Sequence, residues 1–480
     1  MLLWEGGVCR HLLNGLWIWS HHVIPLLSYT LWSHPEIPSE SRCWLGDAAL
    51  GLCYNVANLN GMVAICSLAI CLALTWSYQI ARARGLGALS GLLLLVVVLG
   101  ATGLHFTARC HIFSYLPMLV VYYFSFVSPA SPVKRLIACA LTMAVAVNIH
   151  GAFAISLIVL AAKCAGDLSL CLSRGKDLFI QSATDPRSEL KWSVIILAAS
   201  FFATFLNPRG PALYPHLIQF ANNPVISKLM DEWRSLDLTI GIGPWCFLLL
   251  FALGLWIIIA AKKFPHPADS LLFLLLFVAG VRSMRLIPYF ALLVMPIVGP
   301  SWQVLKLRAA QSSSSLFSKF LTLEERGEAG EKLKPNFPFL MMAIAAVMVA
   351  IFMSVPMLRV KEFDSERMPV KTVTDLAKVI DSGPGFNYDG WGSYIYYRLS
   401  KPVFIDDWED FLPMSFIDEY LTVIRAEKGW PAIMDKYKFV WVLVPKESPL
   451  VSLLQKTGAW HIESEDNVGT LLVKTNGDGR

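Results

Sequence analysis

Charged residues are scarce in this chain. Asp, Glu, Lys and Arg make up 16% of its 480 residues, whereas a soluble domain usually carries about 25%. The net charge is only +5 and the basic residues are spread over short segments, so nucleic acid is not expected as a partner. Apolar residues make up 55% of the chain and the mean hydropathy is +0.55. This composition predicts a protein embedded in a lipid bilayer.

Spacing patterns that bind metals are also missing. All ten cysteines lie at or before Cys246 and none has CxxC spacing, so a zinc ribbon or finger is excluded. We expect no metal and no cofactor, and we interpret the cysteines as small buried residues. The C-terminal third has no cysteine and is therefore no disulfide scaffold. A cleavable signal, with a charged segment before an apolar one, is absent at Met1.

Long apolar blocks dominate what is present. A helix needs about 20 apolar residues to cross a bilayer. The blocks predict about ten spans, of which the fourth, fifth and sixth are short, at residues 61–80, 88–106, 112–128, 136–148, 152–166, 192–206, 244–261, 268–282, 286–301 and 338–357.

The loops between these spans alternate in charge. Every second loop is rich in Lys and Arg, beginning with Arg82 and Arg84 and including Lys262 and Lys263. These loops are expected in the cytoplasm. Joining 136–166 into one helix would move Lys262 and Lys263 outside, so we favour two helices there.

This topology divides the chain into five parts. The first is an extracytoplasmic N-terminal loop with interfacial helices. No helix precedes it to carry it across, so we expect that a first span is missing. We expect this loop at 1–60, a transmembrane helical domain at 61–302, a cytoplasmic linker at 303–337, a last span at 338–357 and an extracytoplasmic α/β domain at 358–480. In that domain, helices are predicted at 372–380, 393–400 and 448–458, and strands at 402–406, 438–445 and 469–475. The fold class is thus a polytopic α-helical membrane protein with a small α/β domain.

Polar residues interrupt the apolar blocks at one membrane face. The stretch NIHGAF, residues 148–153, stands between two short spans. Each such interruption alone fits a helix stop, an interfacial residue or a snorkelling side chain. Their common side predicts a cavity lined by ionisable groups. The candidate substrate-binding residues are Arg109, His111, Asn148, His150, Asn207, Glu232, Trp233, Arg282 and Arg285.

Arginine and histidine beside a membrane suit a phosphate carried on a lipid. A nearby carboxylate serves as general base for an acceptor hydroxyl, and the N-terminal loop offers Glu5, Glu36 and Asp47. This set predicts inverting transfer of a sugar from a polyprenyl-phosphate carrier, with basic residues stabilising the leaving phosphate. The acceptor is a glycan, a lipid or a protein. In FIDDWED, Asp406 and Asp407 only loosely resemble a DxD site.

Several stretches together resemble a bacterial family related to the GT-C class of membrane glycosyltransferases, which includes the protein O-mannosyltransferases. They lie at residues 11–25, 108–116, 148–153, 207–215, 232–238, 386–399 and 402–411. The resemblance covers almost the whole chain. It implies a multi-pass protein of the bacterial inner membrane that acts in cell-envelope glycan assembly and takes sugar from an isoprenoid phosphate.

The resemblance also implies a catalytic acidic residue in the first outer loop. In that family an aspartate-containing stretch precedes the histidine that matches His11, which we expect to bind substrate. Here the stretch is WEGGVCRH. Glu5 stands near the aspartate position and Gly7 at a second acidic position, and the helix expected before the loop is absent. Glu5 is therefore the expected base, with Asp47 as a second catalytic candidate.

Two other functions fit parts of the sequence. A flippase for a lipid-linked sugar would show internal repeats and charges at mid-membrane, which we do not find. A non-catalytic assembly protein would bind glycans through its outer domain, where Trp391, Asp406 and Asp407 are the candidate contacts. The aromatic residues Tyr388, Trp391, Tyr394, Tyr396 and Tyr397 suit stacking on sugar rings, or packing into a small core.

Overall fold

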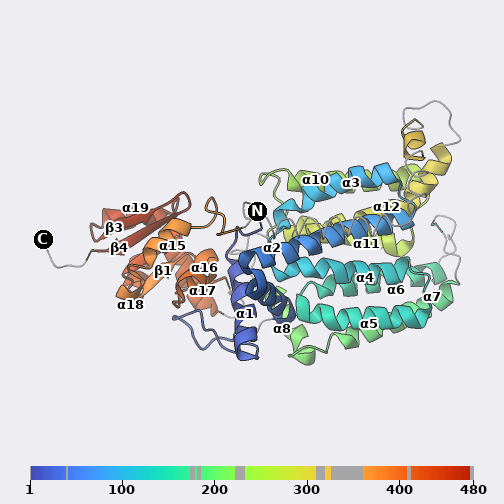
Figure 1. Ribbon diagram of the computed structural model, residues 1–480. Helices are drawn as coiled ribbons and strands as arrows, with labels where there is room; N and C mark the ends of the chain where they lie inside the picture. Colours follow the sequence, from blue (N-terminus) through green and yellow to red (C-terminus); the bar gives the residue numbers. More distant parts are fainter. Residues whose placement is uncertain are drawn as a thin grey trace.

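The computed structural model describes residues 2–38, 42–172, 179–180, 185–221, 233–309, 319–325, 360–407 and 412–475. These residues form a long helical bundle and a small α/β domain at one of its ends (Figure 1). The predicted last span at 338–357, most of the predicted linker and Glu232 lie outside the described residues.

Six helices are long and apolar enough to cross a membrane, at Trp44–Ala83, Ala88–His105, Pro132–Ile149, Phe153–Leu172, Gly243–Ala261 and Met284–Ala309, counted over the described residues. The chain is a multi-pass membrane protein, as predicted. The bundle helices are α2 (Trp44–Ala83), α3 (Ala88–Thr102), α4 (Tyr115–Phe126), α5 (Pro132–Ile149), α6 (Phe153–Leu172), α7 (Pro186–Ala203), α8 (Leu213–Ala221), α10 (Gly243–Ala261), α11 (Pro267–Arg282) and α12 (Ile287–Ala309).

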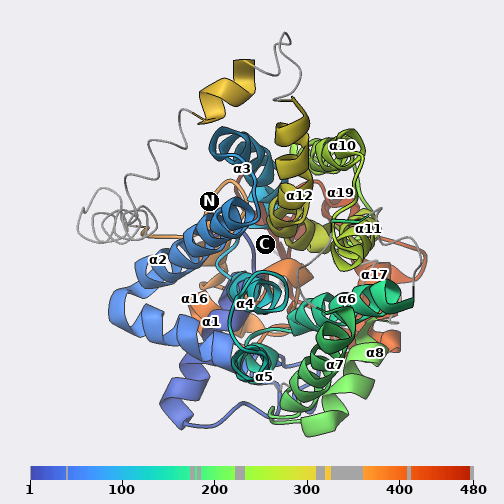
Figure 2. The same cartoon turned by 90° about the vertical axis from the view of Figure 1, so that its right-hand side faces the viewer.

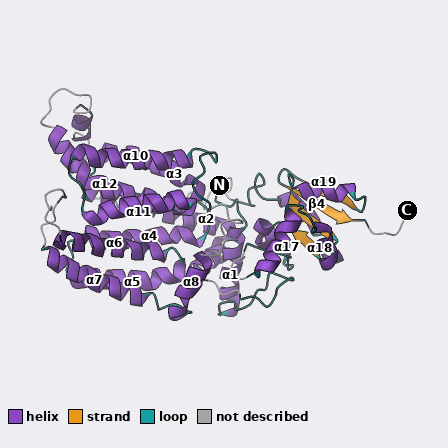
Figure 3. Cartoon of the chain, turned by 180° about the vertical axis from the view of Figure 1, so that it is seen from behind, coloured by secondary structure: helices purple, strands orange, loops and turns teal. Residues whose placement is uncertain are grey.

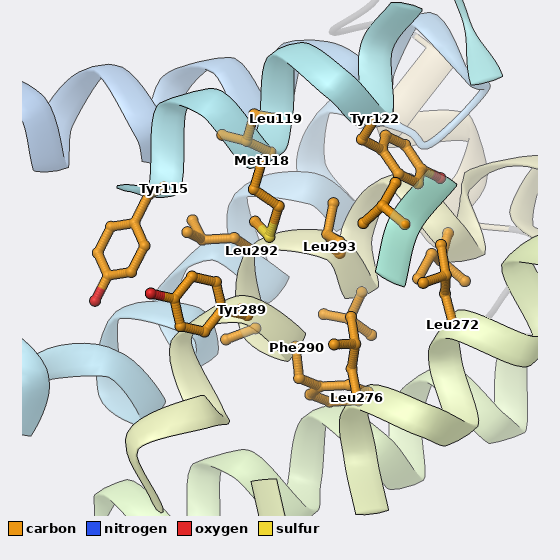
Figure 4. Packing of buried hydrophobic residues seen from close by; sticks show 14 of the residues in the cluster. Tyr115, Met118, Leu119, Tyr122, Leu272, Leu276, Tyr289, Phe290, Leu292 and Leu293 are labelled. Atoms are coloured by element: carbon orange, nitrogen blue, oxygen red, sulfur yellow. The ribbon is translucent and has the colours of Figure 1, made fainter. Parts of the chain in front are cut away.

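The helix α12 lies at the centre of the bundle. The apolar window of its segment is 72% buried within the protein, whereas that of α5 is only 28% buried. A view along the bundle shows α12 and α4 surrounded by other helices (Figure 2). Phe290 and Leu293 of α12 pack against Met118 of α4 and Leu276 of α11 (Figure 4). Apolar residues on several faces of α12 are therefore enclosed by protein rather than by lipid.

The apolar run around NIHGAF is two helices, as predicted. Helix α5 ends at Ile149, His150 has extended backbone angles, and α6 begins at Phe153. The side chain of Asn148 donates to the carbonyls of Ala144 (2.8 Å) and Leu206 (2.7 Å). The backbone N–H of Ala152 donates to Nδ1 of His150 at 3.1 Å. These polar side chains satisfy backbone groups that the helix ends leave open.

The N-terminal segment forms α1 (Gly7–His21), which crosses α2 at very short range. A Cβ atom on Gly15 would lie 2.1 Å from the carbonyl oxygen of Asp47, and one on Gly51 would lie 2.5 Å from the carbonyl carbon of Gly15. Only glycine permits this approach. Helix α2 is broken at Asn58, where φ is +52°, so its first part belongs to the predicted N-terminal segment and its second part is a span.

The C-terminal domain contains a four-stranded mixed sheet in the order β1-β2-β4-β3 (Figure 3). The strands are β1 (Gly385–Asn387), β2 (Trp441–Pro445), β3 (Trp460–Glu465) and β4 (Gly469–Lys474). Phe386 pairs with Val442 in the parallel pair, and Leu443 with Leu471 in an antiparallel one. The helices are α15 (Val370–Leu376), α16 (Gly392–Leu399), α17 (Met414–Ile424), α18 (Trp430–Tyr437) and α19 (Pro449–Lys456). The predicted small α/β domain is confirmed.

The predicted strand at 402–406 is wrong. Val403 forms only an isolated bridge with Leu31 of the N-terminal segment. The backbone N–H groups of Phe404 and Ile405 donate to the side-chain oxygen of Asn387, at 3.0 and 3.3 Å, so a side chain takes the place of a neighbouring strand. The segment is buried and apolar like a strand, but it lies outside the sheet.

This same segment attaches the domain to α1. Arg10 and Asp406 form an ion pair of 2.9 Å, with exposed side-chain fractions of 2% and 0%. Thr30 donates to the same carboxylate oxygen at 2.6 Å and accepts from Arg10 at 3.0 Å. Buried charges are held in place only when they are paired and hydrogen-bonded, so this contact fixes the domain on the end of the bundle.

Candidate active site

The predicted polar residues gather at the end of the bundle that faces the C-terminal domain. Glu5 forms an ion pair with Arg109. His11 lies 3.5 Å from Cys110. The rings of His111 and His150 are 6.1 Å apart. These contacts join residues that come from α1, from η2 (Cys110–Ser114) and from the end of α5.

Two carboxylates and one arginine surround Gly7. A Cβ atom there would lie 3.1 Å from Oε1 of Glu5, 3.2 Å from Oδ2 of Asp407 and 3.3 Å from Cζ of Arg109. Glu5 keeps 23% of its side chain exposed, and Ser393 donates to Asp407. Although Gly7 has no carboxylate of its own, the C-terminal domain brings one beside it. The sequence contains no local signal for this contact.

The surroundings of Asp407 disfavour the charged form of its carboxyl. Burial, together with the charge of Asp406, raises the pKa of its carboxyl above the ordinary value. The folded state therefore holds this proton more tightly than the unfolded chain does. The resulting stability is fully present below the ordinary carboxyl pKa and is lost as the pH rises through the raised pKa.

Asp407→Asn is expected to remove this fall in stability with rising pH, because an amide has no proton to release. The measurement is the thermal unfolding midpoint as a function of pH for both proteins. Asp418→Asn, which changes an exposed aspartate, is the matched control and should follow the wild type. A wild-type pH profile in Asp407→Asn would contradict the prediction.

Asp47 is fully buried in the first turn of α2. It lies 2.6 Å from Nδ1 of His11 and accepts from Asn14 at 3.3 Å. Burial lowers the pKa of His11, but Asp47 outweighs it, so the net effect raises this pKa. Asp47 thus holds the His11 ring in one orientation.

His150 faces another donor. Its Nδ1 accepts from Ala152, so a neutral ring carries its proton on Nε2, which lies 3.4 Å from Nη2 of Arg285. Burial, together with the charge of Arg285, lowers the pKa of His150 well below its usual value, and the ring is neutral at pH 7. Two N–H donors that face each other favour an acceptor between them, and an anionic oxygen suits both.

An arginine-lined cavity of about 170 Å³ opens nearby. Burial, with repulsion from Arg285 and Arg209, lowers the pKa of Arg42 to about 10, which shows that several positive charges share a small space. Arg42 and Arg209 were not among the predicted residues. The cavity is lined by Ile24, Leu26, Arg42, Trp44, Val147, Asn148, Asn207, Pro208, Arg209 and Leu213.

The structure also places the other predicted residues. Asn207 donates to the carbonyls of Thr204 and Gly210 and so shapes the turn beside the cavity. The guanidinium of Arg285 lies over the ring of Trp233 at 5.4 Å. Arg282 is exposed at the end of α11. Trp391 is buried against Tyr388, and Asp406 is fully buried against Arg10.

Two overlapping groups could hold a metal ion: Cys43, Cys110 and His150, and His11, Asp47 and Cys110. Arg42 interacts electrostatically with Cys43, and Arg109 interacts electrostatically with His11, Cys110 and His150. Positive charges this close disfavour a second cation. The surroundings suit an anion better.

A larger cavity of about 550 Å³ lies at the other end of the bundle. Arg135, near the start of α5, lines it, whereas Asn148 near the end of α5 lines the arginine-lined cavity. The charges of the larger cavity pair with one another, as in Lys163–Asp167 (2.6 Å) and Arg135–Glu189 (3.1 Å). None of the predicted site residues that the structure describes lines it.

No model of a protein family and no curated protein matches the sequence. The fold is similar to that of ArnT from Cupriavidus metallidurans in the apo state, with a TM-score of 0.50, 14% identity and coverage of 98% of this chain and 93% of that one. It is also similar to the apo oligosaccharyltransferase of Archaeoglobus fulgidus, with a TM-score of 0.54, 11% identity and coverage of 92% of this chain and 66% of that one.

A second structure of ArnT, bound to undecaprenyl phosphate, has a TM-score of 0.47 at 13% identity, over 98% of this chain and 94% of that one. The likeness to the two apo structures extends over the bundle and the C-terminal domain together. It confirms the predicted GT-C-like fold.

Proposed function

We propose that this protein transfers a sugar from a polyprenyl-phosphate carrier to an acceptor hydroxyl. The observation that carries the proposal is the arrangement of one end of the bundle. A partly exposed carboxylate, Glu5, lies there on Arg109, and the half-buried arginines Arg42, Arg209 and Arg285 lie close to one another. A structure with a similar fold is, by its name, an oligosaccharyltransferase.

In the proposed reaction, Glu5 accepts the proton of the acceptor hydroxyl. The acceptor oxygen attacks the anomeric carbon of the sugar, and the bond from that carbon to the carrier phosphate breaks on the opposite side. The configuration is therefore inverted, and the bonding electrons leave on the phosphate. Arg109 holds the Glu5 carboxylate in place, and a base positioned in this way contributes about 100- to 10,000-fold to the rate.

The phosphate is assigned to the arginine-lined cavity. Arg42 and Arg209 supply charge, and Arg285 with His150 supplies donors at its edge. Guanidinium groups match the geometry of phosphate oxygens. The apolar lining residues Ile24 and Leu26 suit the start of an isoprenoid chain. In this proposal Asp47 is not the base, and it instead positions the ring of His11.

The experiment that tests the proposal is native mass spectrometry of the detergent-purified protein, followed by a transfer assay. A bound mass that matches polyprenyl phosphate, with or without a sugar, supports the carrier. Formation of a glycosylated acceptor supports transfer. If the sugar lipid crossed the liposome bilayer and no glycosylated product formed, the protein would be a flippase and not a transferase. If only bulk phospholipid were bound, the use of a polyprenyl-phosphate carrier would be contradicted.

His150→Ala is expected to weaken binding of polyprenyl phosphate. A hydrogen bond to a charged group contributes about 1.5–3 kcal/mol, which corresponds to roughly a tenfold to hundredfold change in Kd. The measurement is lipid titration by native mass spectrometry. His461→Ala, in an exposed part of the C-terminal domain, is the matched control. Equal Kd values for His150→Ala and the wild type would show that His150 does not bind the lipid phosphate and only shapes the turn between α5 and α6.

A further inference from the structure

Two cysteines from distant parts of the chain meet beneath the arginine-lined cavity. Cys43 is the N-cap residue of α2 and Cys110 begins η2. Both are buried, neither is part of a disulfide, and their thiols are hydrogen-bonded to each other. Their sulfur atoms lie within 4.8 Å of each other.

The backbone around the two thiols is already closely packed. Gly46 stands one helical turn after Cys43, on the same face of α2. A Cβ atom on Gly46 would lie 2.7 Å from Cβ and 3.7 Å from Cα of Cys110. The first turn of α2 therefore rests directly on Cys110. The two sulfur atoms lie within 4.8 Å of each other, and a disulfide brings them to about 2.05 Å, so the thiols have to move together when the bond forms.

The surroundings favour thiolate chemistry over metal binding. The hydrogen bond from Cys110 lowers the pKa of Cys43 despite its burial, and Arg42 and His11 act in the same direction. Thiolates beside positive charges are the reactive form in disulfide exchange. The same positive charges oppose a bound dication.

We propose that Cys43 and Cys110 form an intramolecular disulfide by exchange with a disulfide-bearing thiol oxidant on the outer face of the membrane. The inference rests on the outer location that the loop charges predict for this end of the bundle, and not on sugar transfer. Disulfides persist in such oxidising compartments.

The reaction is a two-step exchange. The Cys43 thiolate attacks one sulfur of the oxidant, and a mixed disulfide forms as the first oxidant thiolate leaves. The Cys110 thiolate then attacks the Cys43 sulfur and displaces the second oxidant thiolate. Two electrons pass from the cysteine pair to the oxidant, and the two protons of the cysteine thiols end on its thiols. Because both cysteines are buried in the folded protein, the exchange takes place while the chain folds.

The crosslink would fix the segments that supply the site. Cys43 is adjacent to Arg42 of the cavity, and Cys110 lies between Arg109 and His111. One covalent bond would therefore hold the phosphate-binding arginine and the arginine that holds Glu5 at a constant spacing. It would also pull the sulfur of Cys110 away from His11, which it contacts at 3.5 and 3.6 Å.

The test is non-reducing peptide mapping of the full-length protein, purified with a thiol-blocking reagent present from lysis and alkylated fully under denaturing conditions, so that only disulfides formed in the cell remain. The expected result is one crosslinked pair of peptides that contain Cys43 and Cys110, with the other eight of the ten cysteines alkylated. Cys43→Ser and Cys110→Ser should each lose the crosslink, whereas Cys66→Ser should keep it. Reductant should lower the Tm of the wild type and of Cys66→Ser.

Recovery of both cysteines in alkylated form would overturn the proposal. So would stoichiometric zinc in the purified protein, measured by elemental analysis, together with protection of both thiols until a chelator is added. The wild-type map decides the matter even if a serine variant fails to fold. A crosslinked protein that transfers no sugar would count against the proposed function alone.

Discussion

Glu5→Gln is expected to abolish sugar transfer and to leave the protein folded. The amide keeps the size of the side chain and accepts the hydrogen bond from Arg109, but it does not take a proton from the acceptor. Loss of a positioned general base lowers the rate by about 100- to 10,000-fold. The measurement is the single-turnover rate with a polyprenyl-phosphate sugar, beside a thermal unfolding curve.

Glu36→Gln provides the control, because it makes the same chemical change at an exposed carboxylate of the N-terminal segment. It should transfer sugar at the wild-type rate. If Glu5→Gln also turned over at that rate, Glu5 would have no part in proton transfer. A lower Tm for Glu5→Gln would instead indicate that the pair with Arg109 serves mainly to hold the fold.

Arg10→Met is expected to produce the largest loss of stability. It leaves the fully buried carboxylate of Asp406 without its cation. Removing one partner of a buried ion pair typically costs about 3–5 kcal/mol. The Tm should fall, and proteolysis should release the C-terminal domain at lower protease concentration, since Arg10 joins that domain to α1.

Lys378→Met is the matched control. Lys378 pairs with Asp375 on the surface and is 69% exposed, and such pairs contribute about 0–1 kcal/mol. The double variant Arg10→Met with Asp406→Leu should recover much of the loss, because it removes both buried charges. An unchanged Tm in Arg10→Met would mean that apolar contacts alone hold the domain in place.

The membrane part of the fold could be predicted because lipid imposes simple rules. Apolar length predicted the six long apolar helices found among the described residues, and alternation of basic loops separated α5 from α6 at His150. The position of α12 at the centre could not be predicted, because a helix surrounded by protein and one surrounded by lipid are equally apolar. In the C-terminal domain, β1 and β3 were missed. The strand β1 has three residues, and the burial of β3 does not alternate regularly, so neither shows a clear period.

The site was predictable only in part. Arg109, His150 and Arg285 were predicted because polar residues are conspicuous at the end of an apolar block, and His11 was predicted from the family resemblance. Arg42 was missed, since it lies in a polar stretch where an arginine is unremarkable. The contact of Asp407 with the space beside Gly7 depends on how two distant segments pack. No local pattern in the sequence encodes such a contact.

The two carboxylates beside Gly7, Glu5 and Asp407, come together only late in biosynthesis. Glu5 leaves the ribosome well before Asp407, because it precedes Asp407 in the sequence. Because domains generally fold as units during synthesis, N-terminal ones first, the helical bundle is inserted while its first loop still lacks that second carboxylate. Arg10 likewise waits for Asp406, which lies 396 positions later. A chain interrupted before the C-terminal domain would reach the membrane without the carboxylates of Asp406 and Asp407, and quality control could recognise it as incomplete.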